Sequence, residues 1–490
     1  MDLRILEISL GAPVAQGGFL VGHLFRYGEN QPTEVIRFVP NAQYIADDTR
    51  RVLSLLFTGE TNDVTQQLLQ DITSAEFNGS RHVNGPVNDR GMPPMMLPSW
   101  FQNLLPEGAF RKHIAELRKC AETDYFELLA ACGADLPGAV YAMPVKDAGE
   151  ELKRRLVTQD NDAIEASVID IPLVEGISLS GIQPKLGVNK DAAGRYVART
   201  KLNQSTHIIA KLPVVDYPLM PEVEHVSMQL ARLAGANACQ TELVPLEKLV
   251  AAHGYDLGDP NPEVTNFLAV PRYDREGTVR IHAEDFAQAL GFAPHDKYAL
   301  EASYAAVMKY CMEFESLGEK AVLELLRRLA VNELIGNPDC HLKNMGVYFP
   351  DGRNPVLPPA YDIVAHHVYN GAVGHALCIL PSEIQRALEQ RQHEQLSREF
   401  QKTQGRPPVG RELPQKLLLL RPSTLRTLAE TVGLPYKQFQ ATADTVVREA
   451  ARRWPAAIDA STLTPAQKNK MKDQLEKQPA VKAARRRGIQ

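Results

Sequence analysis

The sequence predicts an α+β protein with a β-rich N-terminal region and an all-helical C-terminal lobe. Short apolar runs bounded by Gly and Pro, typical of strands, concentrate between residues 177 and 275. From residue 283 onward the apolar residues mostly follow the spacing of amphipathic helices. The chain has 490 residues, whereas a single hydrophobic core stops growing near about 250–300 residues. We therefore expect two or three packed units.

Composition places the chain among ordinary globular proteins. Hydrophobic residues make up 44% and charged residues 23% of it, which excludes the collagen-like, membrane and wholly disordered classes. The net charge of −5 is too small to indicate a partner. No apolar run approaches the roughly 18 residues that span a bilayer, and Asp2, Arg4 and Glu7 interrupt the stretch where a signal peptide needs an apolar core. We therefore expect a cytoplasmic protein without a membrane partner.

The spacing of cysteine and histidine argues against disulfides and zinc. The six cysteines are scattered and form no C-x-x-C pair, and a chain of this length needs no covalent staples. The thirteen histidines show neither an H-x-x-x-H nor an H-E-x-x-H spacing. We expect buried free thiols and no zinc site.

Residues 1–145 are expected to form an N-terminal subdomain. Alternating apolar residues near its start predict strands, and helical patterns follow at residues 110–119 and 124–132. The second helix should end at Gly133. Residues 84–98, which are dense in Pro and Gly, predict a loop.

Residues 146–275 are expected to begin with a charged linker and to form a β-rich lobe. Strands are predicted at residues 205–213 and 266–273. A helix between them should begin near Pro221, because proline fits the first helical turn, and should end at Gly235.

Residues 276–460 are expected to form a helical lobe, and residues 461–490 a flexible basic tail. Residues 321–335 are apolar on most sides and predict a buried helix, whereas residues 386–415 are highly charged and predict an exposed excursion. From residue 465 onward the chain contains eight lysines and arginines but only two acidic residues. This segment therefore has a net charge of +6, and the rest of the chain has −11. A solvated, mobile tail is the first interpretation, and contact with nucleic-acid phosphates is the alternative.

The strongest functional signal follows the predicted buried helix. Gly336 and Pro338 should end that helix, so that Asp339 opens a loop, and Asn344 stands five positions later. An apolar strand, a turn and a return strand then lead to Asp362. If these strands form a hairpin, Asn344 lies beside Asp362, because neighbouring strands are roughly 5 Å apart. A carboxamide and a carboxylate so placed can share Mg²⁺, while Asp339 orients an incoming hydroxyl.

A nucleotide also needs a phosphate cradle and a cation. The backbone N–H groups of the turn from Ser178 to Lys185 (SLSGIQPK) are the candidate cradle, although the turn lacks the G-x-x-x-x-G-K-[ST] of a P-loop. Lys211, in the predicted strand before the helix, is the candidate cation. A solvated charge on an edge strand is the alternative interpretation of this lysine. Glu224 could pair with it, and Glu222 competes for that role because the helix register is open.

Taken together, these motifs resemble those of the HipA family of bacterial serine/threonine kinase toxins. Protein kinases carry a catalytic Asp, a metal-binding Asn five residues later and a further metal-binding Asp, which is the order of Asp339, Asn344 and Asp362. The similarity runs from about residue 35 to residue 450. The motifs that carry it are FQNLLPEG (101–108), CGADLPGA (132–139), SLSGIQPK (178–185), THIIAKLP (206–213), VPRYDR (270–275), EDFAQALG (284–291), DCHLKN (339–344) and PAYDI (359–363).

The resemblance implies a HipA-like two-lobed kinase fold that binds ATP and Mg²⁺, in which residues 146–275 form the nucleotide-binding lobe and residues 276–460 the catalytic lobe. By this resemblance Asp339 would be the catalytic residue, and Asn344 and Asp362 would be the Mg²⁺ ligands. Lys211 would bind the nucleotide phosphates. The remaining nucleotide contacts would include Ser180, Gly181, Ile182, Gln183, Glu224, His341 and Lys343.

The implied adenine contacts are the Pro271 carbonyl and Tyr273. Pro271 departs from the family pattern, which usually has Glu there, so the carbonyl acceptor remains but the side-chain carboxylate does not. Family members are also inactivated when a serine of the phosphate loop is autophosphorylated. Ser178 matches that serine, and Ser180 is the alternative. A dianion in this loop would oppose nucleotide binding by like-charge repulsion.

The implied activity is phosphorylation of a protein by the toxin of a toxin–antitoxin system, with glutamate–tRNA ligase as one known type of substrate. The implied partner is a small helix-turn-helix antitoxin, HipB-like, that binds operator DNA. The acidic body predicts that this chain reaches DNA only through that partner or its basic tail. Two alternatives stay open, namely a catalytically silent corepressor and a small-molecule phosphotransferase. The intact Lys211, Asp339, Asn344 and Asp362 argue against the first, and the N-terminal subdomain argues against the second.

Overall fold

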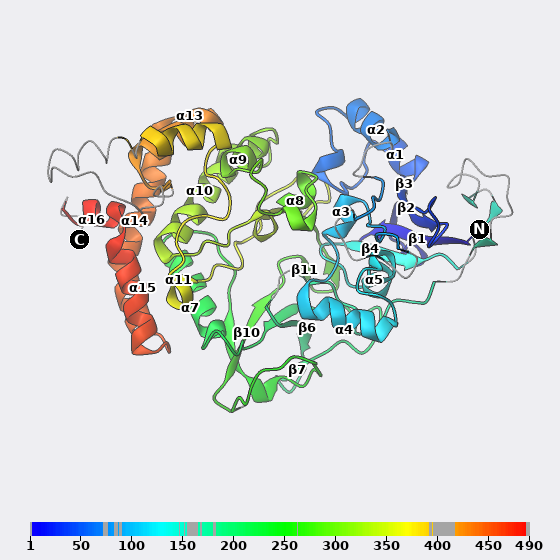
Figure 1. The fold of residues 1–490 in the computed structure, drawn as a ribbon, viewed down its shortest axis with the longest axis horizontal. Coiled ribbons are helices and arrows are strands. Elements are labelled where there is room, and N and C mark those ends of the chain that lie inside the picture. The colour runs from blue at the N-terminus through cyan, green and yellow to red at the C-terminus, as the bar shows by residue number, and fades with distance from the viewer. Residues whose placement is uncertain are drawn as a thin grey trace. The chain divides into compact units, whose positions relative to one another are not determined.

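The chain forms two compact units (Figure 1). Unit 1 comprises residues 1–218, 242–297 and 346–358, and unit 2 comprises residues 219–241, 298–345 and 359–490. Unit 1 therefore combines the expected N-terminal subdomain with most of the expected β-rich lobe. The computed structural model describes residues 2–71, 77–82, 87, 91–146, 148–150, 152–153, 165–166, 169–179, 183–261, 263–391, 394 and 417–486.

Unit 1 begins with a five-stranded sheet in the order β3-β2-β1-β4, with β5 pairing parallel to β1. Alternate side chains such as Leu6, Ile8 and Leu24 are fully buried and share one core with Trp100 and Phe126 of the following helices. Period-two alternation thus gives this sheet one apolar face, which the helices cover. The bounds are β1 (Asp2–Leu10), β2 (Phe19–Tyr27), β3 (Val35–Pro40), β4 (Val140–Pro144), β5 (Glu165–Ala166), α1 (Ala42–Ala46), α2 (Asn62–Gln70), α3 (Ser99–Gln102), α4 (Gly108–Arg118) and α5 (Tyr125–Cys132).

A second five-stranded sheet of unit 1 has the order β7-β6-β8-β10-β9, so β8 is its central strand. Val188, Ala210 and Phe267, from three neighbouring strands, are buried in one cluster on this sheet. Two short strand pairs, β11–β12 and β13–β14, complete the unit. The bounds are β6 (Lys185–Lys190), β7 (Tyr196–Val197), β8 (Ile208–Lys211), β9 (Glu242–Pro245), β10 (Asn266–Pro271), β11 (Arg275–Glu276), β12 (Val279–Arg280), β13 (His282–Asp285), β14 (Gly346–Phe349) and α8 (Phe286–Ala289).

The described part of unit 2 is helical, and α10 packs against α9 and α14. The predicted helices are confirmed: α7 has proline in its first turn, and α10 ends at Gly336 as expected. Trp454 of α14 is buried, and its indole N–H donates to the Leu230 carbonyl on α7 at 2.9 Å. The bounds are α7 (Met220–Leu233), α9 (Tyr304–Met312), α10 (Gly318–Ile335), α11 (His367–Asn370), α13 (Pro422–Val432), α14 (Tyr436–Asp459), α15 (Pro465–Lys477) and α16 (Pro479–Arg486).

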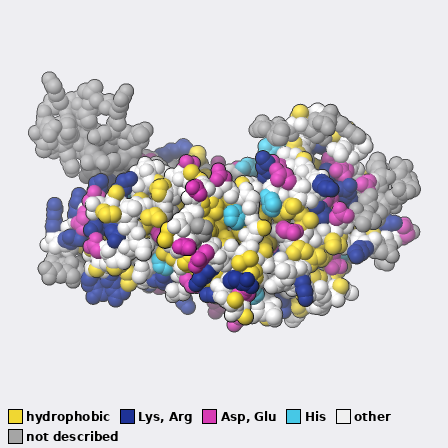
Figure 2. Space-filling view, turned by 90° about the horizontal axis from the view of Figure 1, so that it is seen from below, with side chains coloured by type: hydrophobic (Ala, Val, Ile, Leu, Met, Phe, Trp, Pro, Cys, Tyr) yellow, Lys and Arg dark blue, Asp and Glu magenta, His cyan; other side chains and the backbone are white. Residues whose placement is uncertain are grey.

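The expectation of a flexible basic tail is wrong for residues 465–486, which form α15 and α16. Met471, Leu475 and Val481 are buried, so the helices pack through one face. Their lysines and arginines lie on the other faces, and Figure 2 shows dark blue side chains gathered on its left, where α14–α16 lie in Figure 1. Burial of this face offsets the conformational entropy that a mobile tail would retain.

The expected hairpin after Asn344 is also wrong beyond a single bridge. Tyr348 bridges Val356, but the main partner of β14 is the antiparallel strand β13. Ala360 then forms a parallel bridge with Ala238 of unit 2 instead of continuing the hairpin.

All six cysteines are free, and four of them are buried. Among the described residues, no helix is both long and apolar enough to span a bilayer. Most of the expected excursion at residues 386–415, and part of the expected loop at residues 84–98, lie outside the described residues.

Candidate active site

The loop that carries Asp339 is anchored on the end of α10. Gly336 follows the helix with a φ of 76° and donates its N–H to the Asn332 carbonyl. Asn337 extends this anchor, because its Nδ2 donates to the Asn332 side-chain oxygen at 2.8 Å and its Oδ1 accepts the Asp339 N–H at 3.1 Å. Asn332 and Asn337 are both buried. A buried amide pair that satisfies itself in this way holds the Asp339 backbone on a rigid element.

The Asp339 carboxylate projects from this loop with its side chain 42% exposed. The Tyr298 hydroxyl donates to its Oδ1 at 2.6 Å, and the Nε2 of His341 is 4.0 Å from the same oxygen. His341 is buried and caps the 3₁₀ helix η5 (Leu342–Asn344), where its Nδ1 accepts the Lys343 N–H at 3.2 Å. With Nδ1 as an acceptor, the neutral ring carries its proton on Nε2, on the side of Asp339.

Asn344 and Asp362, the predicted metal ligands, belong to segments that a hydrogen bond joins. The Tyr361 hydroxyl donates to the Lys343 carbonyl at 3.2 Å. Tyr361 directly precedes Asp362 in the chain, and Lys343 directly precedes Asn344. The Nδ2 of Asn344 donates to the Asp339 carbonyl at 2.8 Å, so its Oδ1 is the end available to a cation. The segments of all three predicted residues thus meet within unit 2.

Asp362 has a strained backbone. Its φ is 59°, a left-handed value that only four non-glycine residues of the described chain adopt. The residues after it, 363–365, are buried, and the Ala365 N–H donates to the Ser227 Oγ on α7 at 3.0 Å. Such a conformation costs on the order of 1 kcal/mol and persists only where the surroundings enforce it, which is typical of functional sites.

A divalent ion that needs few protein ligands fits this arrangement. Within the described ranges, no three His, Cys, Asp or Glu side chains form a cluster that could hold a metal ion. Mg²⁺ does not require one, because it commonly takes one or two side-chain oxygens and completes its shell with phosphates and water. The Asp362 carboxylate and the Asn344 carboxamide are oxygen donors of this chemistry.

Lys211 lies in the centre of the second sheet of unit 1, so its interpretation as a solvated edge charge is wrong. It is 5% exposed, and its Cα partners are Lys185 on β6 and Leu268 on β10. Lys185 is 6% exposed. Residues directly opposite each other in antiparallel strands face the same side of a sheet, so the two lysines make one face of this sheet cationic.

The other predicted nucleotide contacts are distributed over both units. Pro271 ends β10 opposite Ile208, and the half-buried Tyr273 stands edge-on to Tyr348 with ring centroids 5.9 Å apart. All four residues belong to unit 1. Glu222 and Glu224 are both buried on α7 and belong to unit 2.

Ser178, the predicted autophosphorylation site, is buried at 1% exposure. Its hydroxyl donates to the Leu104 carbonyl, and its N–H donates to the Asp135 carbonyl at 3.1 Å. The Gln183 Nε2 is 3.4 Å from the Leu212 carbonyl. The remaining predicted loop residues, Ser180, Gly181 and Ile182, lie outside the described residues.

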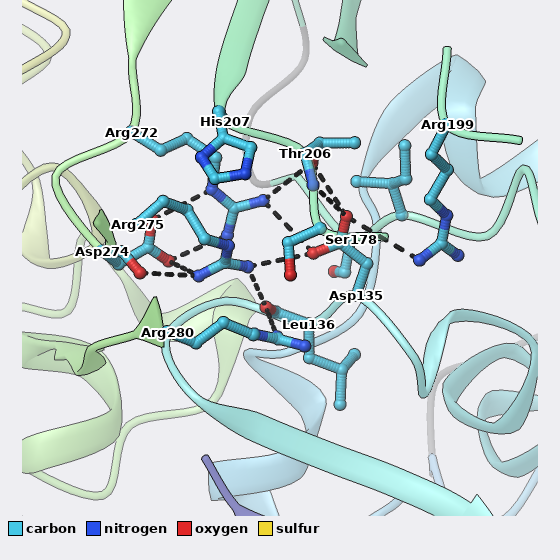
Figure 3. Close-up of polar contacts among 12 residues, drawn as sticks. Asp135, Leu136, Ser178, Arg199, Thr206, His207, Arg272, Asp274, Arg275 and Arg280 are labelled. Atoms are coloured by element: carbon cyan, nitrogen blue, oxygen red, sulfur yellow. Dashed lines mark hydrogen bonds and ion pairs between the residues drawn. The ribbon is translucent and has the colours of Figure 1, made fainter. Parts of the chain in front are cut away.

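A buried ionic network joins the Ser178 segment to the residues after Pro271 (Figure 3). The Asp135 carboxylate accepts Arg275 Nη2 at 2.9 Å and the Thr206 hydroxyl at 2.8 Å. The network also contains Asp274 and the guanidinium groups of Arg199, Arg272 and Arg280. Motifs more than a hundred residues apart in the sequence, CGADLPGA and VPRYDR, are therefore in direct contact in unit 1.

The arginines keep both aspartates of this network ionised. Burial alone would raise the pKa of Asp135, but the surrounding guanidinium groups outweigh it and lower that pKa to about 2. Asp274 accepts Arg272 Nη2 and Arg275 Nη1, each at 2.8 Å, and these charges likewise hold its pKa well below the usual range despite burial. Burial dominates at Arg275 and lowers its pKa to about 9.

Sequence reasoning missed three parts of this arrangement. Tyr298 stands 41 residues before Asp339, and nothing in its local pattern marks it. Asn337 lies between Gly336 and Pro338, which were predicted to end the helix, but its bond to Asn332 depends on the geometry of the helix end. For the ionic network, the available signal was the charged residues within the motifs CGADLPGA and VPRYDR.

Comparisons with known proteins agree with the motif-based resemblance. Two family models match, the HipA N-terminal domain over residues 12–143 and the HipA-like C-terminal domain over residues 177–454. The Sinorhizobium fredii protein named "Putative kinase Y4dM" is 32% identical over 331 residues, 67% of this chain and 71% of that protein. The serine/threonine-protein kinase toxin HipA of Shewanella oneidensis is 27% identical over 292 residues, 54% of this chain and 62% of that one.

A solved structure shares the fold. The HipA chain in the complex of Shewanella oneidensis MR-1 HipA, HipB and operator DNA aligns with a TM-score of 0.62 and 18% identity, over 98% of this chain and 97% of that one. This likeness confirms the expected α+β, HipA-like fold. With both domains of the family matched and a relative above 30% identity over most of its length, the chain belongs to the HipA family.

Proposed function

We propose that this protein is an ATP-dependent serine/threonine protein kinase and the toxin of a bacterial toxin–antitoxin system. The observation that carries the proposal is the anchored loop, in which a partly exposed Asp339 is fixed through its backbone while Asn344 bonds to its carbonyl. Family membership and the kinase names of two relatives support it.

The proposed reaction requires the protein mainly to align the reacting groups. Phosphoryl transfer passes through a loose transition state, so rate depends on positioning and on charge stabilisation. Asp339 would align the attacking hydroxyl, and its exposure leaves room for an acceptor side chain. Asn344 and Asp362 would hold Mg²⁺, which neutralises charge on the phosphates. Lys211, on the cationic face of its sheet, would bind the nucleotide phosphates.

Intact-mass measurement tests the activity. Phosphatase-treated wild-type protein incubated with Mg²⁺ and ATP should gain phosphate, whereas Asp339→Asn should bind ATP and gain none. The matched control is Asp444→Asn, which changes an exposed aspartate on α14 and should behave like wild type. Full phosphorylation of Asp339→Asn would contradict the assignment of Asp339.

Self-modification is proposed at Ser178, with Ser180 as the alternative acceptor. The buried Ser178 hydroxyl bonds to the Leu104 carbonyl, so its phosphorylation requires the segment to leave this position. Peptide mapping of the phosphorylated wild-type chain should therefore place the phosphate on the peptide that contains residues 178–185. Phosphate confined to other peptides would refute this site.

The proposal includes two kinds of partner. The solved relative is a complex with HipB and operator DNA, and we infer that this chain assembles with a small helix-turn-helix antitoxin. The proposed substrate is a protein, and an aminoacyl-tRNA synthetase such as glutamate–tRNA ligase is the candidate. Expression of wild type and Asp339→Asn in a bacterial host, followed by phosphopeptide mapping, should give growth arrest and new phosphosites only with wild type. Equal growth of the two strains would favour a catalytically silent corepressor.

A further inference from the structure

Tyr298 contacts Asp339 but has no role in the chemistry above. Its hydroxyl donates to the Asp339 Oδ1 at 2.6 Å, within the short range of bonds to a carboxylate. Its ring stands edge-on to His341, with centroids 4.9 Å apart and an interplanar angle of 90°. The tyrosine is nevertheless 47% exposed, so it is not a core residue of unit 2.

Different groups hold the backbone and the side chain of Asp339. The Asn337 side chain accepts the Asp339 N–H. The Asp339 carbonyl accepts hydrogen bonds from the Asn344 Nδ2 and from the His341 N–H. Throughout the part of the chain that the structure describes, the hydrogen bond to the carboxylate comes from Tyr298, because His341 Nε2 at 4.0 Å is too distant to donate one. The terminal torsion of an aspartate has a broad minimum, so a carboxylate this exposed needs such a donor to keep one orientation.

We propose that Tyr298 is a positioning residue for phosphoryl transfer: its hydroxyl holds the Asp339 carboxylate by Oδ1 and leaves Oδ2 to receive the acceptor hydroxyl. The inference rests on the proposed kinase function. The ring contact with His341 fixes the tyrosine against the same loop that carries Asp339, so donor and acceptor move together. Loss of the hydroxyl should reduce the fraction of correctly aligned complexes without changing nucleotide binding.

The test compares Tyr298→Phe with wild type. Phenylalanine keeps the ring beside His341 and removes only the hydroxyl, and the exposure of the site makes a folding defect unexpected. The matched control is Tyr436→Phe on α14, where the ring packs against Arg426. The assay is the initial rate of self-phosphorylation of phosphatase-treated protein over a range of Mg·ATP concentrations, with the melting temperature and the affinity for a fluorescent ATP analogue measured in parallel.

The maximal rate of Tyr298→Phe should fall about tenfold, while its half-saturating ATP concentration, its affinity for the analogue and its melting temperature stay at wild-type values. Tyr436→Phe should match wild type in every measurement. This split between rate and binding distinguishes positioning from a purely structural role.

Three results would overturn the inference. An unchanged rate in Tyr298→Phe would show that the hydroxyl does not contribute to the reaction. A faster rate would show that it obstructs the acceptor. A rate loss matched by loss of nucleotide affinity or melting temperature would show a structural role. Each of these, with wild type active and Asp339→Asn inactive, leaves the proposed function standing. Wild type as inactive as Asp339→Asn would overturn the proposed function and this inference with it.

Discussion

Glu284 is a buried carboxylate that ties three segments of unit 1 together. Its oxygens accept the Ser54 hydroxyl at 2.6 Å, the Leu55 N–H at 2.7 Å and the Trp100 indole N–H at 3.2 Å. Burial nevertheless outweighs these donors and raises its pKa to about 7. Stability of this unit should therefore depend on pH in the neutral range.

The direction of that dependence follows from proton linkage. The folded pKa of Glu284 lies above its value in the unfolded chain, near 4.5. Its favourable contribution is complete below about pH 4.5 and is lost as pH rises through about 7. We predict that the melting temperature of wild type, relative to Glu284→Gln, falls between pH 5 and pH 8. Glu263→Gln, at an exposed glutamate, is the control. Parallel pH profiles for wild type and Glu284→Gln would refute the prediction.

The residues of the candidate active site differ in how far the sequence could predict them. Asp339, Asn344 and Asp362 were predicted from their order along the chain, and their roles in catalysis and metal binding stay a prediction. The strain at Asp362 and the bond from Tyr298 arise from contacts between distant segments, and no local pattern encodes them. Burial of Ser178 is likewise a property of the fold, because a serine beside apolar residues is equally common in exposed turns.

Among the elements, α15 has an unexpected part in holding the loop that carries Asp339. Gln474 and Gln478 both direct their Nε2 toward the Glu333 carbonyl, at 3.4 and 3.2 Å. That carbonyl is in the last turn of α10, where carbonyl groups lack partners within the helix. Lys470 donates to the Val368 carbonyl on α11 at 2.6 Å. α15 therefore caps the helix that precedes Asp339 and contacts the helix that follows Asp362.

We predict that Gln474→Ala combined with Gln478→Ala destabilises unit 2 and slows self-phosphorylation. Both glutamines are buried, and an unsatisfied buried carbonyl costs roughly 1–3 kcal/mol. Differential scanning calorimetry should show a lower transition temperature in the double variant. Lys477→Ala on the exposed face of the same helix is the control and should melt like wild type. A double variant with wild-type melting and rate would contradict this role of α15.

The elements that the sequence predicted well are those with a local apolar period. α7 and α10 have such stripes, and their positions were confirmed: α10 ends at Gly336, and Gly235 follows the C-cap residue Ala234 of α7. The buried stripe of α15 contains Gln467 and Gln474 beside its apolar residues, and the C-cap residue Gln478 is buried as well. Hydropathy cannot distinguish such a stripe from a solvated face, and the excess of lysines suggested a mobile tail instead. The strand β14 was predicted, but its main partner was not, because β13 lies some sixty residues earlier in the chain.

At the scale of the whole molecule, the chain enters each unit several times. The expected boundaries near residues 145 and 275 treat domains as continuous stretches. Composition marks where segments change character, but the return of residues 346–358 to unit 1 is fixed by the pairing of β14 with β13. Pairing between distant strands is the part of a topology that a single sequence conveys least.

Ligand linkage provides a test of the proposed metal ligands in the intact protein. Binding to the folded state stabilises it, by about 2.7 kcal/mol at a ligand concentration of 100 Kd. We predict that ATP raises the melting temperature of wild type more with Mg²⁺ than with EDTA. Asp362→Asn should abolish the difference between the two conditions while retaining the shift that ATP alone causes. An undiminished Mg²⁺ effect in that variant would exclude Asp362 as a ligand.

The ionic network around Asp135 also has an evolutionary consequence. Replacing one member leaves a buried charge without its partner, which lowers the free energy of unfolding by about 3–5 kcal/mol. Exchanging several members together for apolar residues is tolerated. Descendants of this sequence should therefore either inherit Asp135, Asp274 and their arginines as a block or lose them as a block. Such correlated inheritance would be visible among homologues, including those in which the residues of the Asp339 loop have changed.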